Sequence, residues 1–80
     1  MSILDKIEPI YIENLERDII SEISKLKSIS YEEAMVIYFD SKISKLIDEK
    51  VNGIQYLDYK YLANEIIEKY DERIRIKVWL

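Results

Sequence analysis

Apolar side chains recur at intervals of three and four residues along most of this 80-residue chain, and that spacing constrains its fold more than any other feature. Residues spaced in this way lie on one face of an α-helix, which can then pack against a core. We therefore predict two long amphipathic helices, at about 10–28 and 58–71. The apolar face of the first is formed by Ile12, Leu15, Ile19, Ile23 and Leu26, and that of the second by Tyr59, Leu62, Ala63, Ile66, Ile67 and Tyr70.

Local signals set the limits of the first helix. Pro9 is tolerated in the first turn of a helix but disrupts its interior, so we expect a short separate segment before Pro9 and the long helix after it. Residues 27–30 interrupt the apolar pattern. Ser30 followed by Glu33 is a capping box, in which the serine hydroxyl accepts a hydrogen bond from the amide of Glu33 and a new helix begins.

The middle of the chain is predicted to hold two shorter helices, at 31–39 and 42–50, joined by a tight turn. Ser41 is a suitable N-cap for the second of them, although the periodicity would also permit one bent helix. Residues 51–53 contain an Asn-Gly pair, which accepts positive φ angles and indicates a loop. Asp58 is in turn a suitable N-cap for the last helix.

The last eight residues follow a different period, because apolar and polar side chains alternate strictly over 73–80. Strict alternation with β-branched residues is typical of a β-strand. The predicted fold is therefore a single mostly α domain over 1–80, a small bundle of three to four helices with a C-terminal β-strand at 73–80. One face of the strand would carry Ile74, Ile76, Val78 and Leu80, and the other Arg73, Arg75, Lys77 and Trp79.

A lone strand must find partners for its backbone N–H and C=O groups. Within this chain, 10–12 and 54–57 are the candidate neighbours, and both are very short. The tail could pair with a second polypeptide, pair with one of these segments, or continue the last helix. We favour pairing with a second polypeptide, because an unpartnered alternating strand readily adds to another chain.

Residue types that dominate protein interfaces gather in two places. Tryptophan and arginine supply many binding hot spots, and both occur in the tail. Tyrosine combines a large rigid ring with a hydroxyl that stays hydrated, and several tyrosines cluster around the start of the last predicted helix. The predicted partner-binding residues are Arg73, Ile74, Arg75, Ile76, Lys77, Val78, Trp79, Leu80, Tyr56 and Tyr59.

The composition argues against catalysis. The chain has no histidine and no cysteine, so the commonest general base, a thiol nucleophile and thiolate metal ligands are all missing. Adjacent acids such as Glu32 and Glu33 diverge by about 100° around a helix and do not converge on one substrate. We therefore expect a protein that is not an enzyme, with no catalytic residues, no metal and no cofactor.

The charge is unevenly distributed. Residues 1–40 carry nine acids and four bases, a net charge of −5, whereas residues 41–80 carry seven acids and eight bases, a net charge of +1. An acidic half disfavours nucleic acid as a partner, because that affinity comes mainly from clustered lysine and arginine. The longest purely apolar stretch, 34–39, is far shorter than the about 18 residues of a membrane span, so we expect no membrane association and a cytoplasmic location.

About half of the chain carries a pattern shared with a known family, through Ile29-Ser30, Glu32-Glu33-Ala34, Tyr38-Phe39, Ser41-Lys42, Leu46, Gly53 and Tyr61-Leu62-Ala63 with Glu65. On these residues, within 29–66, the chain resembles a family of small bacterial antitoxin-like proteins encoded beside toxins of the ADP-ribosyltransferase type. The resemblance implies an accessory protein that binds its toxin, and it supplies no catalytic residues.

We therefore predict a non-catalytic protein–protein interaction module, an antitoxin or inhibitor that binds a partner protein. One alternative is a helix-turn-helix transcription regulator with 42–50 as its recognition helix. Another is a structural protein that binds itself as a homo-oligomer.

Overall fold

The computed structural model describes residues 3–79, with side-chain surroundings for residues 9–74. Its elements are α1 (Ile3–Lys27), α2 (Tyr31–Phe39), α3 (Lys42–Asp48), the 3₁₀-helix η1 (Val51–Tyr56) and α4 (Tyr59–Trp79). The helical bundle that the periodicity predicts is confirmed, and α2 and α3 are two separate helices.

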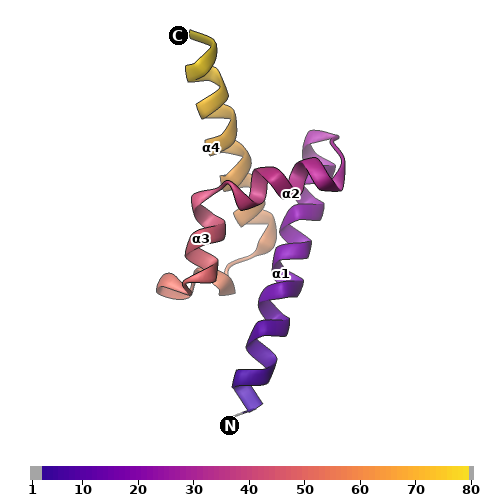
Figure 1. Ribbon diagram of the computed structural model, residues 1–80, viewed down its shortest axis with the longest axis vertical. Helices are drawn as coiled ribbons and strands as arrows, with labels where there is room; N and C mark the ends of the chain where they lie inside the picture. Colours follow the sequence, from indigo (N-terminus) through magenta and orange to yellow (C-terminus); the bar gives the residue numbers. More distant parts are fainter. Residues whose placement is uncertain (1–2, 80) are drawn as a thin grey trace.

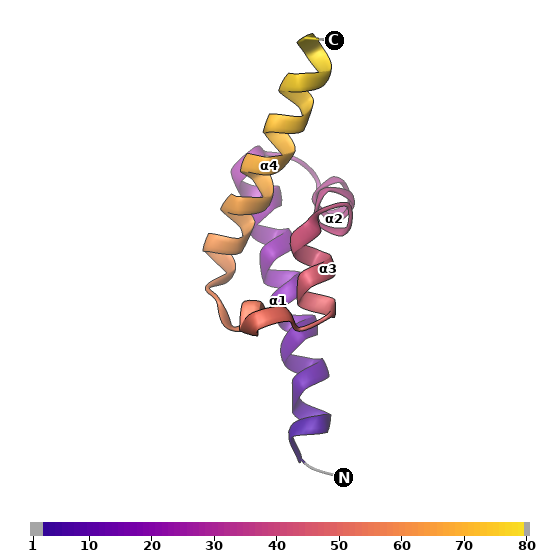
Figure 2. The same cartoon turned by 90° about the vertical axis from the view of Figure 1, so that its left-hand side faces the viewer.

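The two long helices give the molecule its elongated shape. Helix α1 rises from one end of the molecule, α2 crosses the molecule, α3 leads the chain back down, and α4 rises again to the opposite end (Figure 1). The first part of α1 and the last part of α4 therefore project from opposite ends of a central body, as Figure 2 also shows. The molecule measures 52 × 24 × 17 Å along its principal axes.

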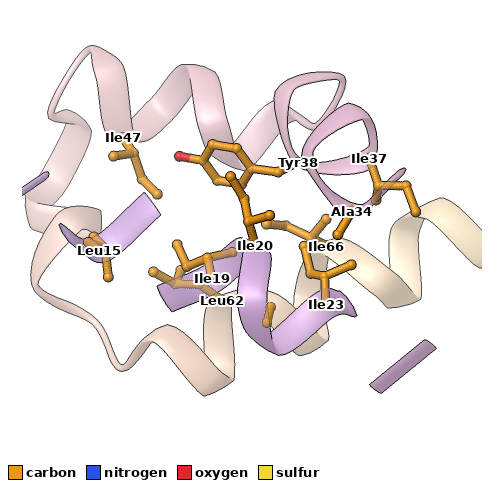
Figure 3. Packing of buried hydrophobic residues seen from close by; sticks show 11 residues of the cluster. Leu15, Ile19, Ile20, Ile23, Ala34, Ile37, Tyr38, Ile47, Leu62 and Ile66 are labelled. Carbon is orange, nitrogen blue, oxygen red and sulfur yellow. The ribbon is translucent and has the colours of Figure 1, made fainter. Parts of the chain in front are cut away.

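The core lies where all four α-helices meet. Helix α1 contributes Leu15, Ile19, Ile20 and Ile23 to it, α2 contributes Ala34, Ile37 and Tyr38, α3 contributes Ile47, and α4 contributes Leu62, Ala63 and Ile66. The ring of Tyr38 lies in the middle of this cluster, between Ile47 and Ile37 (Figure 3). Burial of each such large side chain stabilises the fold by about 1.5–3 kcal/mol.

Helix α1 ends in a tight left-handed turn. Ser28 has φ 54°, and the amide of Ile29 donates to the carbonyl of Ser24 at 3.1 Å, which satisfies a carbonyl that the helix end would leave free. The predicted capping box follows at once, because the amide of Glu33 donates to the Ser30 hydroxyl at 3.1 Å. The Glu33 carboxylate accepts from the same hydroxyl at 3.2 Å.

The turn between α2 and α3 is held by one serine. The Ser41 hydroxyl donates to the carbonyl of Tyr38 in α2 and accepts from the amide of Ser44 in α3, so it joins the two helix ends. The loop predicted at 51–53 is present as a kink within η1. Asn52 and Gly53 both have positive φ angles there, of 53° and 70°, and glycine takes such angles at no steric cost.

Two details of α1 differ from the expectation. The helix begins at Ile3 and contains Pro9, so the predicted start after Pro9 is wrong. Proline fixes φ near −65°, which is helical, so the helix continues through it with the loss of one backbone hydrogen bond. Leu26 is exposed, whereas Ile20, which the predicted stripe omits, is buried because α1 packs against α2 as well as α4.

The predicted strand at 73–80 is wrong over 73–79, which form the last turns of α4; Leu80 lies outside the described residues. Both segments expected to pair with a strand, 10–12 and 54–57, lie in or beside helices and have no edge to offer. Extending an existing helix adds a backbone hydrogen bond with each residue and needs no new nucleus. Helix propagation therefore prevails over the β-propensity of the alternating residues.

Candidate protein-binding surface

Exposed aromatic and aliphatic side chains meet where α1, the end of η1 and the start of α4 come together. Tyr11 is 42% exposed, Tyr56 65% and Leu57 47%, and the centroids of the two tyrosine rings lie 5.8 Å apart with an interplanar angle of 44°. These residues border a shallow hollow between the three segments. We call it the tyrosine surface and define it by Tyr11, Asp18, Tyr56, Leu57, Asp58 and Tyr59.

The charged members of this surface are all acidic. Asp18 and Asp58 are both exposed, and neither forms an ion pair within the part of the chain whose side chains are described. Asp58 is also the N-cap of α4, because its Oδ1 accepts from the amide of Lys60 at 3.1 Å. The Lys60 ammonium lies 6.0 Å from the centroid of the Tyr59 ring, so one of these rings already has a cation beside it.

The structure separates the two groups of predicted partner-binding residues. Tyr56 and Tyr59 belong to the tyrosine surface, at the start of α4. Residues 73–79 form the other end of the same helix, which lies about 20–30 Å further along its axis at 1.5 Å per residue and projects from the body (Figure 1). The two groups therefore do not form one binding surface.

Of the predicted tail residues, Arg73 and Ile74 have described side-chain surroundings. Arg73 donates from Nη2 to the Asp40 carboxylate at 2.8 Å, so its charge is engaged with the end of α2. Ile74 is exposed. The side chains of Arg75, Ile76, Lys77, Val78, Trp79 and Leu80 lie outside the described part.

A second apolar hollow, the α2–α4 groove, lies on another face. It is lined by Ile29, Val36, Ile37 and Tyr70, and it continues past Ile43. Two ion pairs border it: Lys27 with Asp71 and Arg73 with Asp40, each at 2.8 Å. These four charged groups are therefore paired within the chain.

One polar pair points into the body instead of outward. Tyr38 is fully buried, and its hydroxyl donates to the Glu16 carboxylate at 2.7 Å. Burial, followed by this hydrogen bond and the negative charge of Glu16, raises the pKa of Tyr38 far above its ordinary value. This arrangement holds α2 against α1 and leaves the hydroxyl no access to a substrate.

The sequence prediction missed the part of the tyrosine surface that comes from α1. Tyr11 and Asp18 lie about 40 residues from Tyr56 and Asp58, and no local pattern marks them as neighbours. They come together because α1 packs along α4. Asp58 does carry a sequence signal, but that signal predicts only its role as a cap.

No protein-family model matches the chain, and no curated protein or solved structure matches it either. None of the helices over residues 3–79 combines the length and the hydropathy of a membrane span. Within the same residues, no three acidic side chains converge as they would around a metal ion.

Proposed function

We propose that this chain is a non-catalytic protein-binding module that acts as an antitoxin-like inhibitor in the cytoplasm and contacts its partner through the tyrosine surface. The observation that carries the proposal is the adjacency of Tyr11, Tyr56 and Leu57, all exposed. Single exposed apolar side chains are common on any protein, whereas a contiguous group of them beside aromatic rings is typical of an interface.

The choice of inhibitor rests on the resemblance over 29–66 to an antitoxin-like family. Several of the residues that carry the resemblance stabilise this fold, since Ser30 and Ser41 cap helices and Gly53 takes a positive φ angle. A protein with the same bundle would need caps and a turn at the same positions. The resemblance therefore favours a shared fold, and the inhibitory role is inferred from that shared fold.

The DNA-binding alternative gains no specific support. Helix α3 has seven residues, about 10 Å in length, which is short for a helix that must reach bases in the major groove. Its exposed lysines, Lys42 and Lys45, are followed by Asp48 and Glu49, which would face the phosphates with like charge.

The proposal is tested by co-expressing the chain with the product of the adjacent reading frame. We expect the two proteins to co-purify, and the growth defect caused by that product to disappear. The double variant Tyr56→Ala/Leu57→Ala should lose co-purification and rescue, because it removes exposed contact area without touching the core.

The matched control is Tyr31→Ala, which removes an exposed tyrosine at the start of α2, away from this surface. It should bind and rescue like the wild type. Normal binding by Tyr56→Ala/Leu57→Ala, with an unchanged circular dichroism spectrum, would contradict the proposed role of the tyrosine surface.

A further inference from the structure

We infer that the tyrosine surface binds a basic, arginine-bearing segment of the partner protein. The inference deepens the proposed function and rests on it, because it names the chemistry of the partner for the same surface. It is argued from the rings, the carboxylates and the charge of the surrounding half of the chain.

The rings provide flat, electron-rich contacts. The centroids of the Tyr11 and Tyr56 rings lie 5.8 Å apart at an interplanar angle of 44°, so the rings contact each other, and both still expose part of their surface to solvent. A guanidinium is planar and weakly hydrated, and it stacks on aromatic faces better than other charged groups. Lys60 beside Tyr59 is an intramolecular example of the same attraction.

The two carboxylates make this surface negatively charged. Asp18 and Asp58 border the same hollow, and neither forms an ion pair with a lysine or arginine of the described residues. Covering the hollow with an apolar helix would desolvate these carboxylates without a counter-charge, which is costly. A guanidinium can donate two parallel N–H hydrogen bonds to a carboxylate while its face stacks on a ring.

The net charge of the chain also favours a basic partner. Residues 1–40, which include all of α1 and α2, carry a net charge of −5, and the whole chain carries −4. Such a field attracts a basic segment before contact and repels an acidic one.

A second copy of the chain is the competing occupant, because the far end of α4 carries Lys69 and Arg73. Arg73 is already paired with Asp40 in its own chain. The Lys69 ammonium lies 3.9 Å from the Glu72 carboxylate of its own chain, so both of these cations already have an acidic neighbour and would have to leave it to bind a second copy. A basic segment of a different protein is therefore the occupant that we infer.

The experiment titrates the isotope-labelled chain with short synthetic peptides of equal length, rich in arginine, in glutamate or in uncharged apolar residues. We expect amide and ring signals of the tyrosine surface to shift with the arginine peptide alone, and the affinity to fall as salt is raised. The variant Asp18→Asn/Asp58→Asn, in which asparagine preserves the cap, should bind the peptide about tenfold more weakly, which corresponds to about 1.4 kcal/mol.

The matched control is Glu32→Gln/Glu68→Gln. It makes the same change in net charge at two exposed acids that lie outside the hollow. It should change the affinity by less than about threefold. An equal loss of peptide affinity in both double variants would show that the effect comes from net charge alone, and it would overturn the inference. Signal shifts centred on the α2–α4 groove, or equal binding of all three peptides, would also overturn it.

Two further outcomes separate this inference from the proposed function. If the co-expressed partner needs Tyr56 and Leu57 but binds Asp18→Asn/Asp58→Asn normally, the protein-binding role stands and the basic occupant is wrong. If the labelled chain alone shows concentration-dependent shifts at the tyrosine surface with a rising mass, the occupant is a second copy and the inference is overturned.

Discussion

Tyr38 shows how a single polar residue can be part of a core. Its ring is fully buried among isoleucines, and its hydroxyl reaches the half-buried carboxylate of Glu16 on α1. A hydrogen bond to a charged group contributes more than one between neutral groups, and its loss would leave the carboxylate without this donor.

We expect Tyr38→Phe to lower the free energy of unfolding by about 1.5 kcal/mol, at the low end for a charged hydrogen bond because Glu16 is only half-buried. Urea denaturation followed by circular dichroism measures the change. Tyr31→Phe, which alters an exposed ring, should change it by less than about 0.5 kcal/mol. A similar effect of both variants would mean that the buried pair contributes no stability.

The same pair makes stability depend on pH at alkaline values. Because the pKa of Tyr38 is raised in the folded chain, the folded state keeps a proton that the unfolded state releases above a pH of about 10. The wild type should therefore lose stability as the pH rises beyond this value. The loss should be smaller in Tyr38→Phe, and an equal fall of the urea midpoint between neutral and alkaline pH in the two proteins would contradict the assignment.

At the scale of elements, α4 is held by several kinds of contact along its length. Its first half packs Leu62, Ala63 and Ile66 into the core. Beyond these, the Lys27–Asp71 pair ties it to α1, and the Arg73–Asp40 pair ties it to α2. An exposed ion pair such as the second is worth less than about 1 kcal/mol, so this contact adds little to overall stability.

Removal of residues 73–80 tests this description of α4. We expect weaker helical ellipticity, because the last turns of a helix are lost, and a change of less than about 1 kcal/mol in the free energy of unfolding. Binding through the tyrosine surface should persist. Unchanged ellipticity together with lost binding is the result that a pairing strand would give, and it would contradict both the helix and the proposed surface.

At the scale of the whole molecule, the stagger of α1 and α4 sets the shape. The two helices overlap in the central body and extend from opposite ends of it (Figure 2). The radius of gyration over Cα atoms is 13.8 Å, against about 12 Å for a compact domain of 80 residues. The extended ends leave a small core to stabilise a long molecule.

Small-angle X-ray scattering should therefore give a radius of gyration of about 14 Å or slightly more, since hydration adds to the Cα value. The mass should match the 9.6 kDa monomer across a concentration series. A value near 12 Å would show that the helix ends fold back onto the body. A doubled mass would instead favour the homo-oligomeric alternative.

Much of the helical architecture follows from local sequence. Three-and-four spacing predicts the packing faces of α1 and α4, and the caps at Ser30, Ser41 and Asp58 fall where the sequence predicts them. These features are predictable because a cap or an amphipathic face depends on residues within one or two turns. Tyr56 and Tyr59 are likewise identified from residue type and clustering.

The features that depend on contacts between residues far apart in the sequence were decided by the tertiary structure. The tail became helix because no strand edge exists among the described residues to receive it, and Ile20 rather than Leu26 is buried because α2 packs on that side of α1. Tyr11 joins Tyr56 only through the packing of α1 beside the start of α4. The sequence by itself therefore determined the central parts of the helices and the caps between them, through local hydrogen bonds and spacing, but not the start of α1 or the end of α4. The packing of those helices determined which side chains meet, because contacts between residues far apart in the chain exist only in the folded molecule.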